Sequence, residues 1–317
     1  MRKRNKIIIT GAAGFIGSHL TETLLTSGFE VTGIDNFDEF YDPAIKRTNI
    51  HNCMSNDLFQ LCETDIRNIA TIEEIFTPEI DTVIHLAARA GVRPSIEKPL
   101  LYNDVNINGT MSVLEAAKKN GVKKIIFASS SSVYGNNKKI PFSETDNVDF
   151  PVSPYAATKK AGELLCHTYH KLYNMNITCL RFFTVYGPRQ RPDLAIHKFA
   201  RLMLDNKPIP IYGDGTMKRD FTYIDDIIDG IQKALHKCKG YNIYNLGESR
   251  PVTVNDLIEL LENALKTKAI PKRQPEQPGD VKCTYADINR AVKELGYSPE
   301  TPLEDGLAKF AQWIKQS

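Results

Sequence analysis

A short apolar strand that runs directly into a glycine-rich loop is the feature that most restricts the fold of this chain. Residues Ile7-Ile8-Ile9 precede the loop at 10–17, and an apolar-periodic helix is expected at 14–27. Glycines in such a strand–loop–helix unit let the backbone approach a pyrophosphate, whose charge the helix N-terminus stabilises. The unit predicts a dinucleotide site. Five of its residues are expected contacts: Gly11, Gly14, Phe15, Ile16 and Gly17.

Strands and helices are predicted to alternate along the first half of the chain. Apolar segments rich in Ile and Val have the length of strands, at 7–10, 31–35, 59–62, 83–86, 125–129 and 177–181. Helical periodicity occurs between them, at 14–27, 68–76, 100–119 and 154–173. Continuous apolar strands are typical of parallel sheets covered on both faces. The pattern therefore predicts an α/β fold with a doubly wound, Rossmann-type parallel sheet.

The pattern changes after residue 182, where Pro- and Gly-rich loops appear. Helices are expected near 194–205, 223–237, 254–266, 287–295 and 303–316, with one strand at 243–246. We expect a cofactor-binding domain at 1–181, completed by a returning segment near 222–248. A smaller mixed α/β lobe is expected at 182–317.

The ends of the next predicted strands carry further candidate cofactor contacts. Asp35 and Asn36 end the second strand, where a carboxylate accepts hydrogen bonds from a ribose diol and repels a 2′-phosphate, which favours NAD over NADP. Asp65 and Ile66 follow the third strand, at a position suited to adenine. Small residues follow the fourth strand, where the cofactor would pass. For the third and fourth strands a structural turn explains the residues nearly as well. The candidates at the end of the fourth strand are Leu86, Ala87 and Ala88.

Tyr155 and Lys159 lie one helical turn apart, and Ser130 lies in a serine run upstream of them. A free tyrosine is a poor base because its pKa is about 10, but a neighbouring ammonium favours the phenolate. Spacing of four residues places both side chains on one helix face. Ser153 and Pro154 are a suitable N-cap and first residue for this helix. The three residues predict proton removal from an alcohol whose carbon gives a hydride to NAD.

Composition excludes several classes of protein. Lys plus Arg (40) nearly balances Asp plus Glu (38), so no basic surface for nucleic acid is expected. No segment has the apolar length of a membrane span. The six cysteines form no C-x-x-C pair and no cluster with histidine, so neither a metal site nor disulfides are expected. A cytoplasmic protein is predicted.

Several motifs together resemble the extended short-chain dehydrogenase/reductase proteins that act on nucleotide sugars, and the resemblance runs nearly end to end. The motifs are the glycine loop at 10–17, Asn106-Ile-Asn-Gly-Thr110, Ser129-Ser-Ser-Ser-Val-Tyr-Gly135, Tyr155 with Lys159, Arg181-Phe-Phe-Thr-Val-Tyr-Gly-Pro188 and Met217-Lys-Arg-Asp-Phe-Thr-Tyr-Ile-Asp-Asp226. Within the family, the chain looks most like UDP-glucuronate 4-epimerases. The resemblance implies that Asn106 belongs to the NAD site and that the lobe at 182–317 binds a UDP-sugar.

The resemblance also indicates which reaction follows oxidation at C4. Related 4,6-dehydratases carry an Asp-Glu pair, and related decarboxylases a Glu, where this chain has Ser131 and Ser132. Neither serine is a strong acid or base, so the chain resembles an enzyme that only returns the hydride. We expect interconversion of UDP-glucuronate and UDP-galacturonate through a 4-keto intermediate. The alternatives are a UDP-glucose/UDP-galactose 4-epimerase, a UDP-glucuronate decarboxylase and a catalytically silent NAD-binding protein.

The remaining candidate residues concern the sugar nucleotide. Arg191 could bind the substrate carboxylate, aided by Thr184 and Ser131, although a solvated loop arginine is the alternative since Arg189 is equally near. Arg219 resembles the family residue that binds the UDP diphosphate; otherwise it is a surface ion-pair partner. Asp280 resembles a residue near the uridine ribose, or it is a turn residue.

A homodimer is also expected. Apolar stripes on the helix of Tyr155 (Ala157, Ala161, Leu164 and Leu172) and through Val113, Leu114 and Ala117 could form a helix bundle between subunits, as in relatives. Core packing within one subunit is the alternative explanation of both stripes.

Overall fold

The computed structural model describes residues 5–275 and 281–316, which are built around a parallel sheet of seven strands. The strands are β1 (Lys6–Thr10), β2 (Glu30–Asp35), β3 (Phe59–Glu63), β4 (Ile80–His85), β5 (Lys124–Ser130), β6 (Asn176–Phe182) and β10 (Tyr241–Leu246). Their order is β10-β6-β5-β4-β1-β2-β3, and every neighbouring pair is parallel. The predicted doubly wound α/β fold is confirmed.

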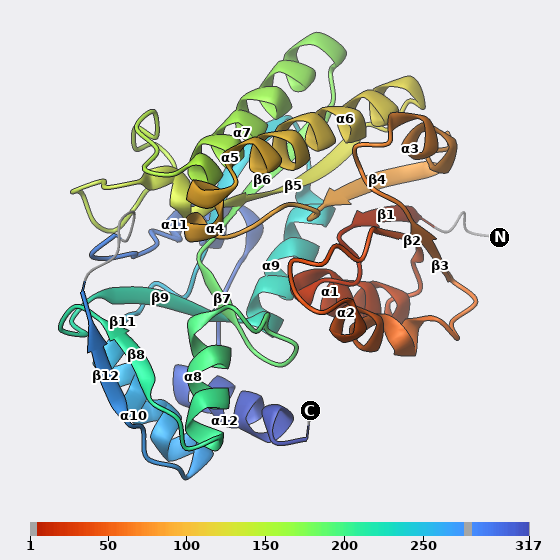
Figure 1. Cartoon of the computed structure of the whole chain (residues 1–317). Coiled ribbons are helices and arrows are strands. Elements are labelled where there is room, and N and C mark those ends of the chain that lie inside the picture. The colour runs from red at the N-terminus through yellow and green to blue at the C-terminus, as the bar shows by residue number, and fades with distance from the viewer. Residues whose placement is uncertain (1–4, 276–280, 317) are drawn as a thin grey trace.

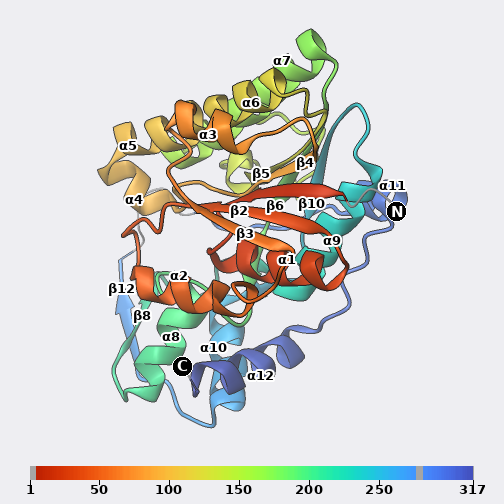
Figure 2. The same cartoon turned by 90° about the vertical axis from the view of Figure 1, so that its right-hand side faces the viewer.

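Helices cover both faces of this sheet (Figures 1 and 2). One face carries α1 (Phe15–Thr26) and α9 (Ile224–Lys237), with α2 (Pro43–Ile50) beside α1; the other carries α3 (Ile69–Ile75), α5 (Pro99–Asn103), α6 (Gly109–Lys119) and α7 (Pro154–Tyr173). Alternation along β1 explains the two layers. Ile7 and Ile9 pack into the core on the α1 face, whereas Ile8 packs into the core beneath α6 and α7.

The second half of the chain adds a smaller lobe below the carboxyl ends of the strands (Figure 1). It contains a sheet of β7 (Thr184–Tyr186), β9 (Lys218–Tyr223) and β11 (Pro251–Thr253), and a pair of β8 (Ile209–Tyr212) with β12 (Pro271–Gln274). Helices α8 (Ala195–Leu204), α10 (Val254–Leu265) and α12 (Leu303–Ile314) pack against these strands. Helix α11 (Asn289–Leu295) returns to the edge of the large sheet, beside β10.

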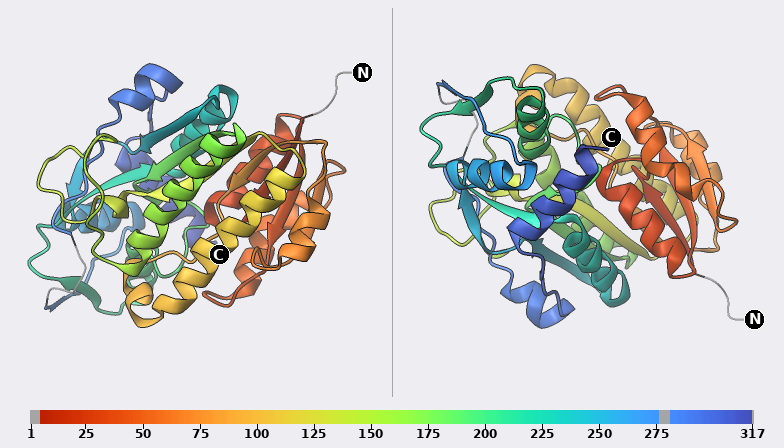
Figure 3. Two further views of the ribbon diagram at one scale, coloured as in Figure 1. Left: turned by 90° about the horizontal axis from the view of Figure 1, so that it is seen from above. Right: turned by 90° about the horizontal axis from the view of Figure 1, so that it is seen from below.

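Helix α7 begins as its sequence indicates. The Ser153 hydroxyl accepts a hydrogen bond from the Ala156 amide at 3.1 Å, and Pro154 is the first helical residue. Asn174, in the left-handed conformation at φ 54°, ends the helix. Viewed from above, α6 and α7 run side by side across the sheet (Figure 3). Helix α7 therefore presents one side to the sheet along its whole length.

A buried ion pair ties α7 to the sheet one turn beyond Lys159. Arg181 on β6 donates to both carboxylate oxygens of Glu163, each at 2.8 Å, and both side chains are 1% exposed. The Ser129 hydroxyl, at the end of β5, donates to the same carboxylate at 2.6 Å. Arg181 also donates to the Tyr134 hydroxyl at 2.9 Å, which in turn donates to Asn245 on β10 at 2.7 Å. One polar network therefore joins β5, β6, β10 and α7.

Several elements differ from the sequence prediction. Strand β4 starts at Ile80, three residues before its expected start. The helix expected at 100–119 is interrupted by a π turn, η2 (Asp104–Asn108), and the short helices α2, α4 (Val92–Glu97), η1 (His51–Cys53) and η3 (Ser131–Tyr134) were not predicted. Val113, Leu114 and Ala117 are buried in the core beneath α6, so core packing within the subunit explains this stripe.

We expect the Glu163–Arg181 pair to respond asymmetrically to substitution. Arg181→Met should lower the free energy of unfolding by about 3–5 kcal/mol, because it leaves a buried carboxylate without its counter-charge. Glu163→Leu combined with Arg181→Met should cost less than Arg181→Met alone, since no buried charge then remains. Denaturant unfolding monitored by circular dichroism measures both. An Arg181→Met variant whose free energy of unfolding lies within 1 kcal/mol of wild type would contradict this account.

Candidate active site

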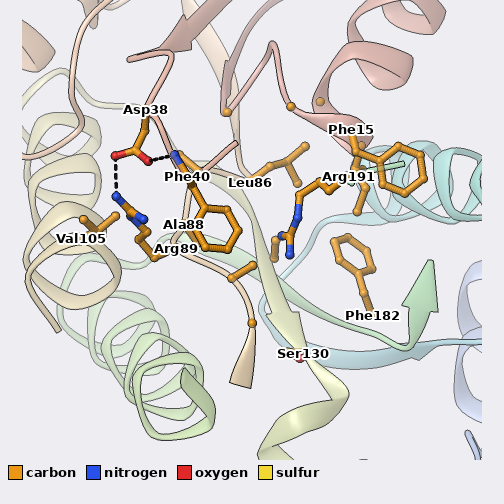
Figure 4. Close-up of a pocket in the computed structure, with 18 of the residues that line it drawn as sticks. Phe15, Asp38, Phe40, Leu86, Ala88, Arg89, Val105, Ser130, Phe182 and Arg191 are labelled. Atoms are coloured by element: carbon orange, nitrogen blue, oxygen red, sulfur yellow. Dashed lines mark hydrogen bonds and ion pairs between the residues drawn. The ribbon is translucent and has the colours of Figure 1, made fainter. Parts of the chain in front are cut away.

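A cavity of about 490 Å³ opens where the carboxyl ends of β1, β2, β4 and β5 face the loop between β7 and α8. Figure 4 shows part of it. Most of the residues expected to act at a site line this cavity: Gly11, Gly14, Phe15, Ile16, Gly17, Asp35, Asn36, Asp65, Ile66, Leu86, Ala87, Ala88, Ser130, Ser131, Tyr155, Lys159, Thr184 and Arg191. The fold thus brings candidate cofactor and substrate residues, distant in sequence, into one space.

The glycine loop leaves room for no side chain at two positions. A Cβ at Gly17 would lie 2.0 Å from the Gly11 carbonyl oxygen, and a Cβ at Gly11 would lie 2.9 Å from the Ala87 nitrogen. Gly11 also has a φ of +73°, which disfavours larger residues. Helix α1 begins at Phe15, within the residues of the loop, with no side-chain cap on its first amides. Those N–H groups therefore remain for an anion, as the pyrophosphate of a dinucleotide requires.

Asp35 lies at the end of β2 and is almost fully buried. Its Oδ2 accepts from the Ala13 amide at 3.0 Å and its Oδ1 from the Phe37 amide at 2.9 Å. Burial raises the pKa of this carboxyl, and the hydrogen bond from Phe37 opposes the change. Each oxygen keeps a second lone pair, so the group can still accept hydrogen bonds from ribose hydroxyls.

A second carboxylate joins the ends of β2 and β3. Asn36 donates to Asp65 at 2.8 Å, and Arg67 holds the same carboxylate through its Nη2 at 2.8 Å. The hydrogen bond from Arg67 lowers the pKa of Asp65 to about 2. Asp65 is therefore ionised at neutral pH, and it forms a polar wall beside Ile66 at the adenine end expected from the sequence.

Tyr155 and Ser130 meet at the other end of the cavity. Burial raises the pKa of the Tyr155 phenol, while a hydrogen bond with Ser130 and the charge of Arg191 lower it. The Ser130 oxygen already accepts a hydrogen bond from the Ser132 amide at 3.1 Å, which fixes its position at the start of η3. The Ser130 hydroxyl proton is thus available to the phenolic oxygen or to a substrate hydroxyl.

Lys159 lies on the same side of α7 but contacts the sheet. Its ammonium donates to the Ala128 carbonyl at 2.7 Å and lies 5.3 Å from the centre of the Phe127 ring. Burial lowers the pKa of Lys159 to about 8. The amine still carries a charge at neutral pH, and its hydrogen bond to β5 fixes its position in the cavity lining.

A chain of hydrogen bonds runs beneath the cavity and fixes the protonation of His85. Thr110 donates to the Asn106 carbonyl at 2.6 Å, so its oxygen must accept from His85 Nε2 at 3.0 Å. His85 Nδ1 then accepts from Thr10 at 2.7 Å, and Thr10 accepts from the Ala87 amide at 3.2 Å. Burial lowers the pKa of His85 to about 3. The ring is therefore neutral and positions the backbone around the cavity.

Asn106 stands behind the cavity wall rather than on it. Its Oδ1 accepts from the Arg89 amide at 2.8 Å, and its Nδ2 donates to the Arg89 carbonyl at 2.9 Å and to Thr158 at 3.0 Å. The side chain sits in the π turn η2, a feature often found near functional sites. Asn106 thus fixes the loop after β4 and is not among the residues that line the cavity; its place in the NAD site stays a prediction.

Arg191 enters the cavity from the loop before α8. Its Nε and Nη2 both contact the Asp193 carboxylate, at 2.9 and 2.7 Å, and its guanidinium lies 5.3 Å from the centre of the Phe40 ring. This ion pair uses the guanidinium edge formed by Nε and Nη2. The edge formed by the two terminal nitrogens is still able to donate to another acceptor. Figure 4 shows that the side chain lies between Phe40 and Phe182. By contrast, Arg189 does not line the cavity and pairs with Glu22 on α1 at 2.8 Å.

One expected substrate residue in the described part of the chain is not among those that line the cavity. Arg219, on β9, donates to the Lys218 carbonyl at 2.9 Å and lies outside the lining set. Asp280 lies outside the described residues. The lining residues that were not predicted include Asp38, Phe40, Tyr41, Lys46 and Arg89. Their signal is their position just after β2 and β4, because ligands in open α/β sheets bind beyond the carboxyl ends of strands.

Two further observations concern the described part of the chain. None of its helices combines the length and apolarity that crossing a membrane demands. Within the same residues, His, Cys, Asp and Glu side chains do not gather in threes as a metal-binding group. All six cysteines are free thiols.

Comparison with known proteins gives consistent matches along the chain. Residues 7–247 match the model of the NAD dependent epimerase/dehydratase family. UDP-glucuronate 4-epimerase from Thermodesulfobacterium geofontis is 46% identical, over 98% of this chain and 96% of its own length. The crystal structure of UDP-glucuronic acid 4-epimerase from Bacillus cereus with UDP-glucuronic acid and NAD has a TM-score of 0.93 and 44% identity, covering 98% of this chain and 99% of its own.

A more distant structure shares the fold as well. UDP-glucose 4-epimerase from Thermotoga maritima, with UDP-glucose, has a TM-score of 0.90 at 34% identity, covering 98% of this chain and 99% of its own. The glycine loop, the acidic end of β2 and the Tyr155–Ser130 contact agree with these similarities. The chain therefore belongs to the NAD dependent epimerase/dehydratase family.

Proposed function

We propose that this chain is an NAD-dependent isomerase that inverts C4 of UDP-glucuronate to give UDP-galacturonate, reversibly and through a 4-keto intermediate. One observation carries the proposal. A single cavity holds the glycine loop and Asp35 at one end and Tyr155, Ser130 and Arg191 at the other. Full-length similarity to UDP-glucuronate 4-epimerases, at 44% and 46% identity, supports the same reaction.

The cavity suits NAD at its glycine-rich end. The uncapped amides of α1 would meet the pyrophosphate, and Asp35 would accept hydrogen bonds from the adenosine ribose. When bound, NAD supplies reversible hydride acceptance at C4, and its positively charged ring favours a phenolate nearby. Asp65 and Ile66 would lie beside the adenine. The buried carboxylate of Asp35 disfavours the additional phosphate of NADP.

Tyr155 would remove the proton from the 4-hydroxyl. Burial alone keeps this phenol neutral, so the base needs a hydrogen-bond donor and neighbouring positive charge to act. Ser130 supplies the donor and would hold the same substrate oxygen. Lys159, protonated at neutral pH and fixed to Ala128, would add the charge from below.

Arg191 would bind the substrate carboxylate through the guanidinium edge that Asp193 does not use. The hydroxyls of Thr184 and Ser131 line the same cavity and would complete the carboxylate site. A 4-keto uronate loses CO2 when its carboxylate aligns with the carbonyl π system. Charge-assisted hydrogen bonds from Arg191 would hold the carboxylate out of that alignment while the sugar turns.

The same residues weigh against the alternatives. A neutral hexose would leave the Arg191 edge that Asp193 does not use without a charged acceptor in a mostly buried position, which disfavours a UDP-glucose/UDP-galactose epimerase. Ser131 and Ser132 provide no carboxyl group for a decarboxylase. Arg219 and Asp280 are retained as proposed contacts of the UDP diphosphate and uridine ribose, at the far end of the substrate.

We further propose that the protein is cytoplasmic and forms a homodimer. Free thiols at all six cysteines support a reducing compartment. Ala157, Ala161 and Leu164 share one exposed side of α7, and Leu164 is 56% exposed. Leu172 on the same helix and Leu100 on α5 are 67% and 84% exposed. A helix face of this kind suits contact with the same face of a second copy.

Tyr155→Phe should lower kcat for UDP-glucuronate by about 10²- to 10⁴-fold, because it removes the base and leaves the cavity shape intact. Product analysis by chromatography, without added NAD, measures the rate. The NAD content of the purified variant serves as control and should match wild type. Turnover at the wild-type rate would contradict the assignment.

Arg191→Ala should reduce kcat/KM for UDP-glucuronate by about 10- to 100-fold, since a hydrogen bond to a charged group contributes about 1.5–3 kcal/mol. Arg189→Gln removes the same charge two residues away, outside the cavity, and should leave this value near wild type. Parallel assays with UDP-glucose and UDP-glucuronate measure the selectivity. Equal losses on both sugars would favour the hexose epimerase instead.

Leu164→Glu should convert the dimer to a monomer at micromolar concentration, because it places a charge in the centre of the proposed α7 contact. Sedimentation velocity measures the change. Ile270→Glu, a matched change at an exposed residue next to β12, on the opposite side of the molecule from α7, should remain dimeric (Figure 1). A wild-type monomer would overturn this part of the proposal.

A further inference from the structure

An ion pair crosses the cavity between two loops that are far apart in sequence. Arg89, in the loop after β4, donates through Nη2 to Asp38 at 2.9 Å, and Asp38 follows β2. The other oxygen of Asp38 accepts from the Phe40 amide at 2.8 Å. Figure 4 shows Asp38 between these two donors, with Arg89 reaching it from below. We call residues 36–42, held in this way by Arg89, the Asp38–Arg89 strap.

Further contacts secure both ends of the strap. The Arg89 guanidinium lies 5.3 Å from the centre of the Phe40 ring, and Lys46 donates to the Asp38 carbonyl at 2.7 Å. The backbone of Arg89 is fixed by the two hydrogen bonds with Asn106. A direct path therefore runs from the buried π turn, through Arg89, to the segment after β2.

The position of the strap follows from the order of the strands. In the sheet, β4 and β2 lie on either side of β1. A bridge between the loops that follow β4 and β2 must therefore pass over the carboxyl end of β1, where the glycine loop begins. A dinucleotide seated on Gly11–Gly17 would lie beneath it.

Arg89 also has a donor that the protein leaves unused. Its Nε is buried and has no hydrogen-bond partner among residues 5–275 and 281–316. Buried donors in native proteins are nearly always paired, so this atom calls for an acceptor that a ligand brings. The other cations of the cavity are engaged: Lys159 with Ala128, Arg191 with Asp193, and Lys46 with Asp38. The glycine loop itself, at 10–17, contains no Lys or Arg.

We propose that Arg89 is a further cofactor-binding residue whose unused donor binds a phosphate oxygen of the dinucleotide, while its ion pair with Asp38 closes residues 36–42 over the bound cofactor. The inference rests on the proposed NAD site but not on the sugar. An enzyme that returns the hydride it has taken gains nothing from releasing its cofactor between turnovers. The strap gives this chain a means of retaining it. Asp38 is then a positioning residue, and Arg89 is the contact.

The rate at which bound NAD exchanges with isotopically labelled NAD tests this in the full chain, with no sugar present. Arg89→Gln should exchange about 10- to 100-fold faster than wild type, because it loses a charge-assisted hydrogen bond. Arg89→Lys keeps the charge but lacks Nε, and should fall between the two. Asp38→Asn should accelerate exchange by about 3- to 10-fold, since it breaks a partly buried ion pair and leaves Arg89 in place.

Arg93→Gln is the matched control. It removes the same charge from the adjacent helix α4, where Arg93 packs on the Tyr212 ring outside the cavity, and exchange should stay at the wild-type rate. Thermal unfolding of the NAD-free proteins reports whether each variant folds. If Arg89→Gln purifies without NAD, calorimetric titration should give a Kd raised by the same 10- to 100-fold.

The outcomes separate the parts of the proposal. Exchange of Arg89→Gln within twofold of wild type would overturn the cofactor contact. An unchanged rate in Asp38→Asn would overturn the strap. The double variant Asp38→Asn/Arg89→Gln should exchange NAD no faster than Arg89→Gln, because both substitutions break the same ion pair. The wild-type protein could fail to epimerise UDP-glucuronate while the NAD exchange rates change as expected. That result would overturn the proposed function and leave this inference standing.

Discussion

The ion pair between Glu163 and Arg181 is the interaction on which the geometry of the site depends. Two buried charges would be costly alone, and their cost is offset because both carboxylate oxygens and all three guanidinium nitrogens form hydrogen bonds. The pair fixes the position of α7 along strands β5 and β6. Tyr155 is two turns before Glu163 on that helix, and Ser130 directly follows Ser129 on β5, so the phenol and the hydroxyl meet as a consequence.

A second buried network sets the opposite side of the cavity. The chain from the Ala87 amide through His85 to the Asn106 carbonyl uses neutral groups only, and Thr10, His85 and Thr110 each donate one proton and accept another. It fixes the loop after β4, which carries Arg89. The cavity of the proposed reaction therefore lies between two hydrogen-bonded networks, and Arg191 and the Asp38–Arg89 strap reach it from loops.

Local patterns predicted what depends on neighbours in sequence. The strand cores, the cap of α7 by Ser153 and the glycine loop all follow from periodicity and turn chemistry, and the structure has them within a few residues. The short polar strands β7 and β9 and the helix α2 have weak periodicity and are stabilised by tertiary contacts. Pairs such as Asp38 with Arg89 join residues 51 apart, and nothing local marks them. The sequence motif identified Asn106 as a candidate, but only the fold shows that its side chain binds the Arg89 backbone behind the cavity wall.

The edge strand β10 has a consequence for how the protein is made. Tyr241 to Leu246 pair with β6 along its whole length, and Asn245 accepts from Tyr134 and donates to the Phe142 and Asp287 carbonyls. A nascent chain that has emerged only to the end of β6 has an open sheet edge and an incomplete support for the Arg181 network. The ribosome must deliver a further stretch of polypeptide before that edge closes. The network that positions α7 is therefore complete only after the second half of the chain has returned to the sheet.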